Sequence, residues 1–137
     1  MTAALPQMTC GIWPAGRRLV AVITEGGGSE RTLVLASSDD ARWGLVQLLT
    51  RSVCTELVVP ETILRADPIV RMAAAEQVPM WSVPRAVIDP IRRAAGISER
   101  SPKKIAAVLA RLPAIPVLRQ QLRRVALPVT SRQLRLL

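Results

Sequence analysis

The chain has 137 residues and a formal net charge of +9, and its apolar half contains neither Phe nor Tyr. It has no His and two Cys, so neither a four-ligand zinc site nor a His-based general base can be built from it. This length fits one domain with an aliphatic core, and no cofactor is expected. Without Phe and Tyr the usual platforms for stacking bases are missing, so any contact with nucleic acid should be mainly to the backbone.

The first third of the chain predicts an antiparallel meander. Turn residues 14–17 (PAGR) and 26–29 (GGGS) separate three β-branched runs, at residues 8–12, 19–24 and 31–36. The glycine run precedes a strand instead of a helix, which favours a hairpin turn over a phosphate-binding loop. Next, Ser37 to Asp40 can cap a helix over residues 41–50, whose apolar face would include Trp43. The adjacent acids at 39–40 are better explained by this cap than by a metal site.

The middle of the chain alternates strand and helix patterns. Residues 56–60 (ELVVP) form an apolar run typical of a strand covered on both faces, and residues 78–83 predict a second such strand. Helical patterns follow each of them, over 67–76 and 84–96, with Pro90 as a potential kink. The order β-β-β-α-β-α-β-α predicts an α/β fold, a mixed sheet flanked by helices.

Positive charge is concentrated at the C-terminal end. Residues 100–137 carry nine Lys/Arg and no Asp or Glu, whereas residues 1–76 carry seven basic and eight acidic side chains. A helix is predicted over 102–112, Pro113 and Pro116 then break the chain, and a second amphipathic stretch covers 117–125; residues 127–137 show no clear period. We expect an α/β domain over residues 1–100 and a basic helical extension over 101–137.

The location of the protein is predicted from its cysteines and hydropathy. Cys10 and Cys54 lie in or beside apolar runs, which favours two buried, reduced thiols over a disulfide or a nucleophile. No apolar run approaches the length of about 18 residues that a membrane span needs, and no charged leader precedes a hydrophobic segment. A cytoplasmic setting without membrane contact is therefore expected.

Several short motifs resemble the RuvC-like, DEDD-type transposases, which have the ribonuclease H-like fold. Residues 11–23, beginning Gly-Ile-Trp, are similar to the first hairpin of that family, which begins Gly-Ile-Asp. Residues 57–62 (LVVPET) resemble its fourth strand, which ends in Glu, and residues 83–96 resemble the stretch after its fifth strand. Residues 100–106 (RSPKKIA) stand where the family has Lys-Thr-Asp-x-x-Asp-Ala. The resemblance covers roughly residues 8–112 and implies a ribonuclease H-like sheet.

The departures from this family concern its metal ligands. Its four carboxylates bind two metal ions that hold a phosphodiester. At the matching positions this chain has Trp13, Pro60, Pro102 and Ile105, with Glu61 displaced by one residue from the Glu position. On a strand such a shift turns the side chain to the other face. The resemblance therefore implies shared shape without nuclease or transposase activity, so neither a catalytic residue nor a metal is expected.

The leading hypothesis is a non-catalytic protein of mobile-element type that binds nucleic-acid backbone or helps to assemble a complex. The residues expected to make these contacts are Arg92, Arg93, Lys103, Lys104, Arg119, Arg123 and Arg124. Phosphate contacts confer no sequence specificity and weaken steeply with salt.

Two further hypotheses remain open. In the first, the protein is an interaction module, and the apolar face of the C-terminal helices docks onto a second copy or an acidic protein partner. In the second, Glu61, Asp67 and Asp89 form an active metal nuclease. Glu61 and Asp67 are instead expected to be solvated acids of a loop at a strand end.

Overall fold

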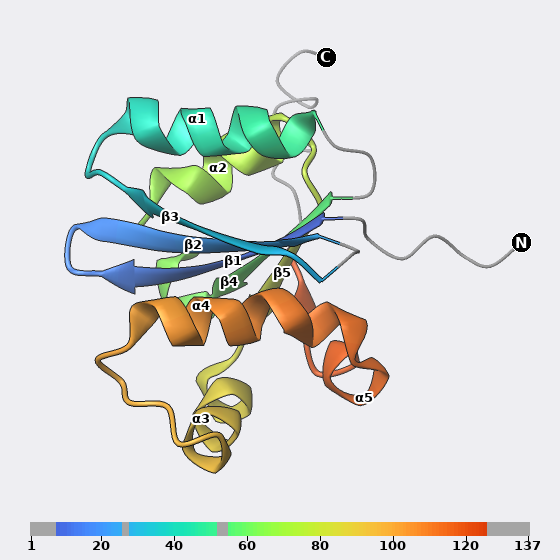
Figure 1. Cartoon of the computed structure of the whole chain (residues 1–137). Helices are drawn as coiled ribbons and strands as arrows, with labels where there is room; N and C mark the ends of the chain where they lie inside the picture. The colour runs from blue at the N-terminus through green and yellow to red at the C-terminus, as the bar shows by residue number, and fades with distance from the viewer. Residues whose placement is uncertain (1–7, 26–27, 52–54, 126–137) are drawn as a thin grey trace, which may run out of the picture.

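The computed structural model describes residues 8–25, 28–51 and 55–125. They form a mixed sheet with helices on both faces (Figure 1). In chain order the strands are β1 (Met8–Ala15), β2 (Arg18–Glu25), β3 (Glu30–Leu35), β4 (Thr55–Pro60), β5 (Met80–Val83) and β6 (Arg123–Arg124). Their order across the sheet is β3-β2-β1-β4-β5-β6. The expected α/β fold with a mixed sheet is confirmed.

The first three strands are antiparallel, and the next two run parallel to β1. Met8 of β1 pairs with Glu25 of β2, and β2 pairs in turn with β3, which confirms the predicted meander. Gly16 takes the left-handed conformation that the β1–β2 turn requires (φ +65). Strand β4 pairs in parallel with β1, and β5 in parallel with β4. The carboxyl ends of β1, β4 and β5 therefore meet at one edge of the sheet.

The helices are α1 (Asp39–Thr50), α2 (Pro68–Ala75), α3 (Arg85–Ala94), α4 (Pro102–Arg111) and α5 (Pro116–Arg119), with 3-10 turns η1 (Glu61–Ile63) and η2 (Leu112–Ala114). Helices α1 and α2 cover one face of the sheet, and α4 covers the other face with α3 and α5 beside it (Figure 1). The predicted cap of α1 is confirmed, because the Ser38 hydroxyl accepts a hydrogen bond from the Ala41 N–H at 3.2 Å. Helix α3 continues through Pro90.

The core is aliphatic, as its composition predicts. One buried cluster lies between the sheet and α1–α2 and includes Leu49, Leu57 and Ile69. A second cluster lies on the opposite face and includes Ile88 and Ile105. Cys10 is a free, buried thiol, and this burial raises its pKa to about 12, so the thiol stays protonated at neutral pH. Cys54 lies outside the described residues.

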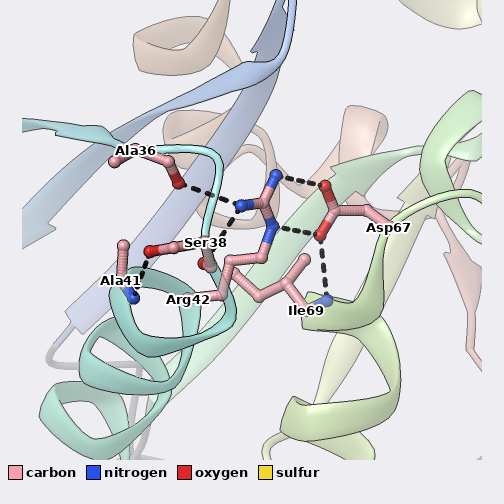
Figure 2. Close-up of polar contacts among 6 residues, drawn as sticks. All are labelled: Ala36, Ser38, Ala41, Arg42, Asp67 and Ile69. Carbon is pink, nitrogen blue, oxygen red and sulfur yellow. Dashed lines mark hydrogen bonds and ion pairs between the residues drawn. The ribbon is translucent and has the colours of Figure 1, made fainter.

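The buried face of α1 differs from the expectation at its first turn. Trp43 is 40% exposed, whereas its neighbour Arg42 is only 7% exposed. The reason is an ion pair across the gap between α1 and α2 (Figure 2). Arg42 donates from Nε to Asp67 Oδ1 at 2.8 Å and from Nη2 to Asp67 Oδ2 at 2.9 Å. Helix α1 is oriented so that the Arg42 guanidinium is buried, and the Trp43 indole is therefore left partly exposed.

The Arg42–Asp67 pair is fully hydrogen-bonded within its neighbourhood. Arg42 Nη1 donates to the carbonyls of Ala36 (3.0 Å) and Ser38 (3.2 Å), and Asp67 Oδ1 accepts the Ile69 N–H at 2.9 Å, which caps α2. The hydrogen bond to Asp67 raises the pKa of Arg42 above its ordinary value. Burying two charges is favourable only with such complete satisfaction. This pair therefore fixes the start of α1 against the start of α2.

The expected basic extension is folded onto the sheet in its described part. Helix α4 packs against β1 and β2, and β6 adds to the edge of the sheet beside β5. The amphipathic pattern over 117–125 does not form a helix throughout, because α5 ends at Arg119 and the chain then turns to pair with β5. The proposed division of the chain at residue 100 stays a prediction, and residues 127–137 lie outside the described residues.

Gly11 permits the close approach of α4 to β1. A Cβ atom at this position would lie 2.1 Å from the Ala106 carbonyl oxygen, 2.6 Å from the Ala110 nitrogen and 2.9 Å from the Leu109 Cβ. Two of these atoms belong to helix backbone, so the clash cannot be relieved by a side-chain rotation. The helix also presents small residues, Ala106 and Ala110, to the strand. Gly11 therefore sets the distance between α4 and the sheet.

Gly11→Ala is expected to lower the free energy of unfolding by about 3 kcal/mol or more, because α4 must move away from β1. The matched control is Gly44→Ala in α1, where nothing lies within 4 Å of the added Cβ. That control should raise stability by about 1 kcal/mol through helix propensity. Urea denaturation of both variants measures the difference, and equal stabilities would contradict the close packing.

Arg42→Ala is expected to cost about 3–5 kcal/mol of unfolding free energy, because it leaves the Asp67 carboxylate nearly buried without its cation. Arg71→Ala, on the exposed side of α2, is the control and should change stability by less than about 0.5 kcal/mol. Thermal and chemical denaturation would report the loss. Similar values for both variants would show that the ion pair contributes little.

Candidate functional site

A pocket of about 190 Å³ opens at the carboxyl ends of the parallel strands, beside α3 and the start of α4. Its apolar lining comes from five elements: Trp13 of β1, Pro60 of β4, Val83 of β5, Ile88 of α3 and Ile105 of α4. Ligands of open α/β sheets bind at this edge, in the crevice outside the carboxyl ends of the strands. The pocket is therefore the candidate functional site.

Three of the four positions that the resemblance would match to metal ligands come together here, whereas the fourth, Pro102, is not among the residues that line the pocket. Trp13, Pro60 and Ile105 all line the pocket. Glu61 lines it as well, which corrects the expectation that a one-residue shift turns it away. The reason is that β4 ends at Pro60 and Glu61 begins the 3-10 turn η1, so the alternation of a strand no longer applies.

The charged residues that line the pocket are ion-paired. Arg92 donates to Glu99 at 3.2 Å and to the Ile97 carbonyl at 3.0 Å, and it lies 3.9 Å from Asp89. Arg85 lies 3.5 Å from the other oxygen of Asp89. These contacts hold the carboxylates in place, and each carboxylate still has lone pairs to offer because it can accept about four hydrogen bonds.

The three acids of the nuclease hypothesis do not form one site. Glu61 and Asp89 line the pocket, but Asp67 binds Arg42 and caps α2. Within residues 8–25, 28–51 and 55–125, no group of three or more His, Cys, Asp or Glu is placed to hold a metal ion. The geometry thus separates Asp67 from the other two acids.

The seven basic residues of the leading hypothesis fall into two groups. Arg93, Lys103 and Lys104 are exposed on α3 and α4 and take part in no ion pair among the described residues. The others contact the protein itself, as Arg92 does in the pocket. Arg123 lies 3.7 Å from Glu61, and Arg124 stacks over the Trp81 ring at 5.2 Å.

Arg119 belongs to a buried cluster around Glu56 that the sequence analysis missed. Its Nη1 and Nη2 donate to the two Glu56 oxygens, each at 3.0 Å, and its guanidinium lies 4.9 Å from the centre of the Trp81 ring. The Trp81 Nε1–H donates to Glu56 at 2.7 Å. A signal for this cluster exists in the sequence, because an acid inside the covered run ELVVP needs a cation or a donor.

Acidic residues of the first half pair with arginines of the C-terminal third. Arg111 contacts Glu30, Arg119 contacts Glu56 and Arg123 contacts Glu61. Part of the positive charge of residues 100–137 is therefore used in ion pairs within the protein. These basic residues do not form one continuous surface of unpaired cations. Arg119 in particular is removed from the set of proposed phosphate contacts.

The apolar face of α4 also has a partner inside the molecule. Ile105 and Leu109 are buried in the core cluster beneath the sheet. The interaction-module hypothesis therefore loses α4 as a docking surface. What remains exposed is smaller, namely Ile115 before α5 and Val117 within it.

Comparison of the chain with protein-family models and with curated proteins found no match. Among the residues that the structure describes, no helix combines the length and apolarity needed to cross a membrane.

Arg119→Ala is expected to lower the unfolding free energy by about 1–3 kcal/mol, because Glu56 keeps only the Trp81 hydrogen bond among the contacts described above. The loss should appear locally as faster amide hydrogen exchange at Val125, whose N–H bonds to the Met80 carbonyl. Arg124→Ala removes one cation–π contact and should cost at most about 1 kcal/mol. Equal exchange in both variants would show that Arg119 does not hold α5 and β6 in place.

Proposed function

We propose that this chain binds the phosphate backbone of nucleic acid without cleaving it, through cations at the carboxyl edge of its sheet. In this proposal the fold is a degenerate ribonuclease H-like domain related to the RuvC-like, DEDD-type transposases. Binding to nucleic acid within a mobile-element assembly would be its role. A reducing cytoplasm is the proposed setting, in keeping with the free thiol of Cys10.

The cations without an acidic partner carry this proposal. Lys103 and Lys104 lie in the first turn of α4, and Arg17 and Arg18 follow the end of β1. The start of α4 and the β1–β2 turn lie at the same end of the molecule (Figure 1). None of the four takes part in an ion pair among the described residues. Their combined field attracts a polyanion to this edge.

The placement of the two lysines costs stability. Helix α4 has no acid in its first turn, and Ser101 makes no capping hydrogen bond. Positive side chains at a helix N-terminus oppose the helix dipole, and phosphate groups are the favourable occupants of such a position. An arrangement that is unfavourable in the free protein and favourable with a bound anion supports phosphate binding.

Two features support the proposed ancestry. The described elements run β-β-β-α-β-α-β-α before the basic region, the order that the resemblance implies. The residues at the ligand positions, Trp13, Pro60 and Ile105, share one pocket although they are distant in sequence. None of these three side chains can bind a metal ion, which supports a binding function over phosphodiester cleavage.

Lys103→Glu/Lys104→Glu is expected to weaken binding to a labelled single-stranded oligonucleotide and to lower the slope of log K against log [salt] by about 1.4, from two lost phosphate contacts. The substitution complements the dipole of α4, so unfolding would not explain the loss. Fluorescence anisotropy over a series of NaCl concentrations measures both quantities.

The matched control is Arg51→Glu/Arg71→Glu, which changes the net charge equally at two exposed positions, at the end of α1 and in α2, the helices on the other face of the sheet. It should leave the salt slope nearly unchanged. Equal effects of the two double variants would show that only net charge matters. Absence of binding by the native protein at low salt, to DNA and to RNA, would overturn the proposed function.

A further inference from the structure

We propose that the pocket at the carboxyl edge accepts one unpaired nucleobase that carries an amino group, while the phosphates stay outside on the cations. This inference rests on the proposed function and adds a recognition step to it. It concerns the space lined by the apolar residues Trp13, Ile88 and Ile105 and by the acidic residues Glu61, Asp89 and Glu99.

The size and lining of the pocket suit a small aromatic ring. Its volume of about 190 Å³ is below the range of about 300–1,000 Å³ that drug-sized ligands occupy, so the guest must be small. Trp13 provides an aromatic surface, and Val83, Ile88 and Ile105 provide an apolar one. Aromatic side chains are the usual platforms for unstacked bases, and Trp13 is the aromatic residue among those that line this pocket.

The charges that line the pocket exclude a phosphate. Three carboxylates, Glu61, Asp89 and Glu99, and two guanidinium groups, Arg85 and Arg92, line it. Both guanidinium groups are ion-paired with these carboxylates, and Glu61 is paired with Arg123, so no unpaired cation is among the described residues that line the pocket. Arg92 is held by Glu99 and the Ile97 carbonyl, which leaves it little capacity for an anion. A phosphate would meet repulsion inside the pocket and attraction outside it.

The same carboxylates favour a guest with N–H donors. Asp and Glu accept hydrogen bonds from the amino group of cytosine, and adenine and guanine present comparable donors, whereas thymine and uracil lack an amino group. A cationic side chain of a protein partner would also suit the carboxylates. However, the positive field of the whole protein repels a basic partner before it reaches them. A nucleic-acid strand suits both sets of charges: its phosphates can contact the cations outside the pocket, and the amino group of a neutral base can donate to the carboxylates that line it.

The test compares three labelled single-stranded probes of one length: oligodeoxycytidine, oligothymidine and an abasic phosphodiester chain. At fixed low salt the native protein should bind oligodeoxycytidine about tenfold more tightly than the abasic chain, since stacking of a base on an aromatic residue is worth about that factor. Oligothymidine should fall between them. Trp13→Ala should bind all three with the affinity of the abasic chain.

Two further variants keep the test decisive if Trp13→Ala does not fold. Trp43→Ala removes an exposed indole on the other side of the sheet and should bind as the native protein does. Glu99→Gln alters a side chain that is 73% exposed, so it should fold normally and reduce the preference for cytidine over thymidine several-fold.

Each outcome separates this inference from the proposed function. Equal affinity of the native protein for the three probes would overturn base insertion and leave backbone binding in place. An unchanged cytidine preference in Glu99→Gln and a normally folded Trp13→Ala would do the same. No binding to any probe would overturn both proposals. Binding of an oligoarginine peptide that quenches Trp13, without a response to the oligonucleotides, would assign the pocket to a basic protein partner instead.

Discussion

The contact between α4 and β1 at Gly11 determines where the candidate site lies. Because Gly11 has no Cβ, the backbone of α4 at Ala106 and Ala110 can lie directly against the backbone of β1. This proximity buries Ile105 under the sheet and brings the first turn of α4 to the carboxyl edge. The apolar floor of the pocket and the exposed lysines above it are therefore consequences of one packing distance. A larger residue at position 11 would move both together.

Two carboxylate–guanidinium pairs complete this frame, one on each side of the sheet; the first is nearly buried, and in the second the carboxylate is nearly buried. Arg42 and Asp67 join α1 to α2 on one side, and Glu56 and Arg119 join β4 to α5 on the other. The second pair belongs to a series in which Glu30, Glu56 and Glu61 meet Arg111, Arg119 and Arg123 in the same order along the chain. The uneven charge distribution of the sequence thus guides the C-terminal segment back across the sheet. Only the cations left over after this pairing are available to a partner.

The sequence predicts the elements better than the charge pairing. Turn residues and β-branched runs locate the first three strands, and Ser38 locates the start of α1, because these signals are local. Helical periodicity, by contrast, places Trp43 in the core, because it considers only which residues are apolar. It cannot show that Arg42 is buried by an ion pair with Asp67, twenty-five residues further along the chain. Glu61 is a different case, because the predicted strand already ends at Pro60 and strand alternation does not apply beyond it. The pairing of Arg42 and the fate of residues 117–125 depend on Asp67 and on the free edge of β5. Such features depend on tertiary contacts that no local pattern encodes.

Under the proposed ancestry, the residues at the positions matched to metal ligands change the kind of guest that the edge of the sheet can accept. Carboxylates at these positions would repel phosphate unless bound metal ions neutralised them, so a site built from carboxylates needs metal ions to hold a phosphodiester. Trp13, Pro60 and Ile105 replace that charge with an apolar recess, and the remaining acids line the recess together with two arginines. The proposed phosphate contacts then lie outside the recess, on Lys103, Lys104 and the β1–β2 turn. In the proposed function the backbone is therefore held at the rim of the pocket, and the centre has space for an uncharged group.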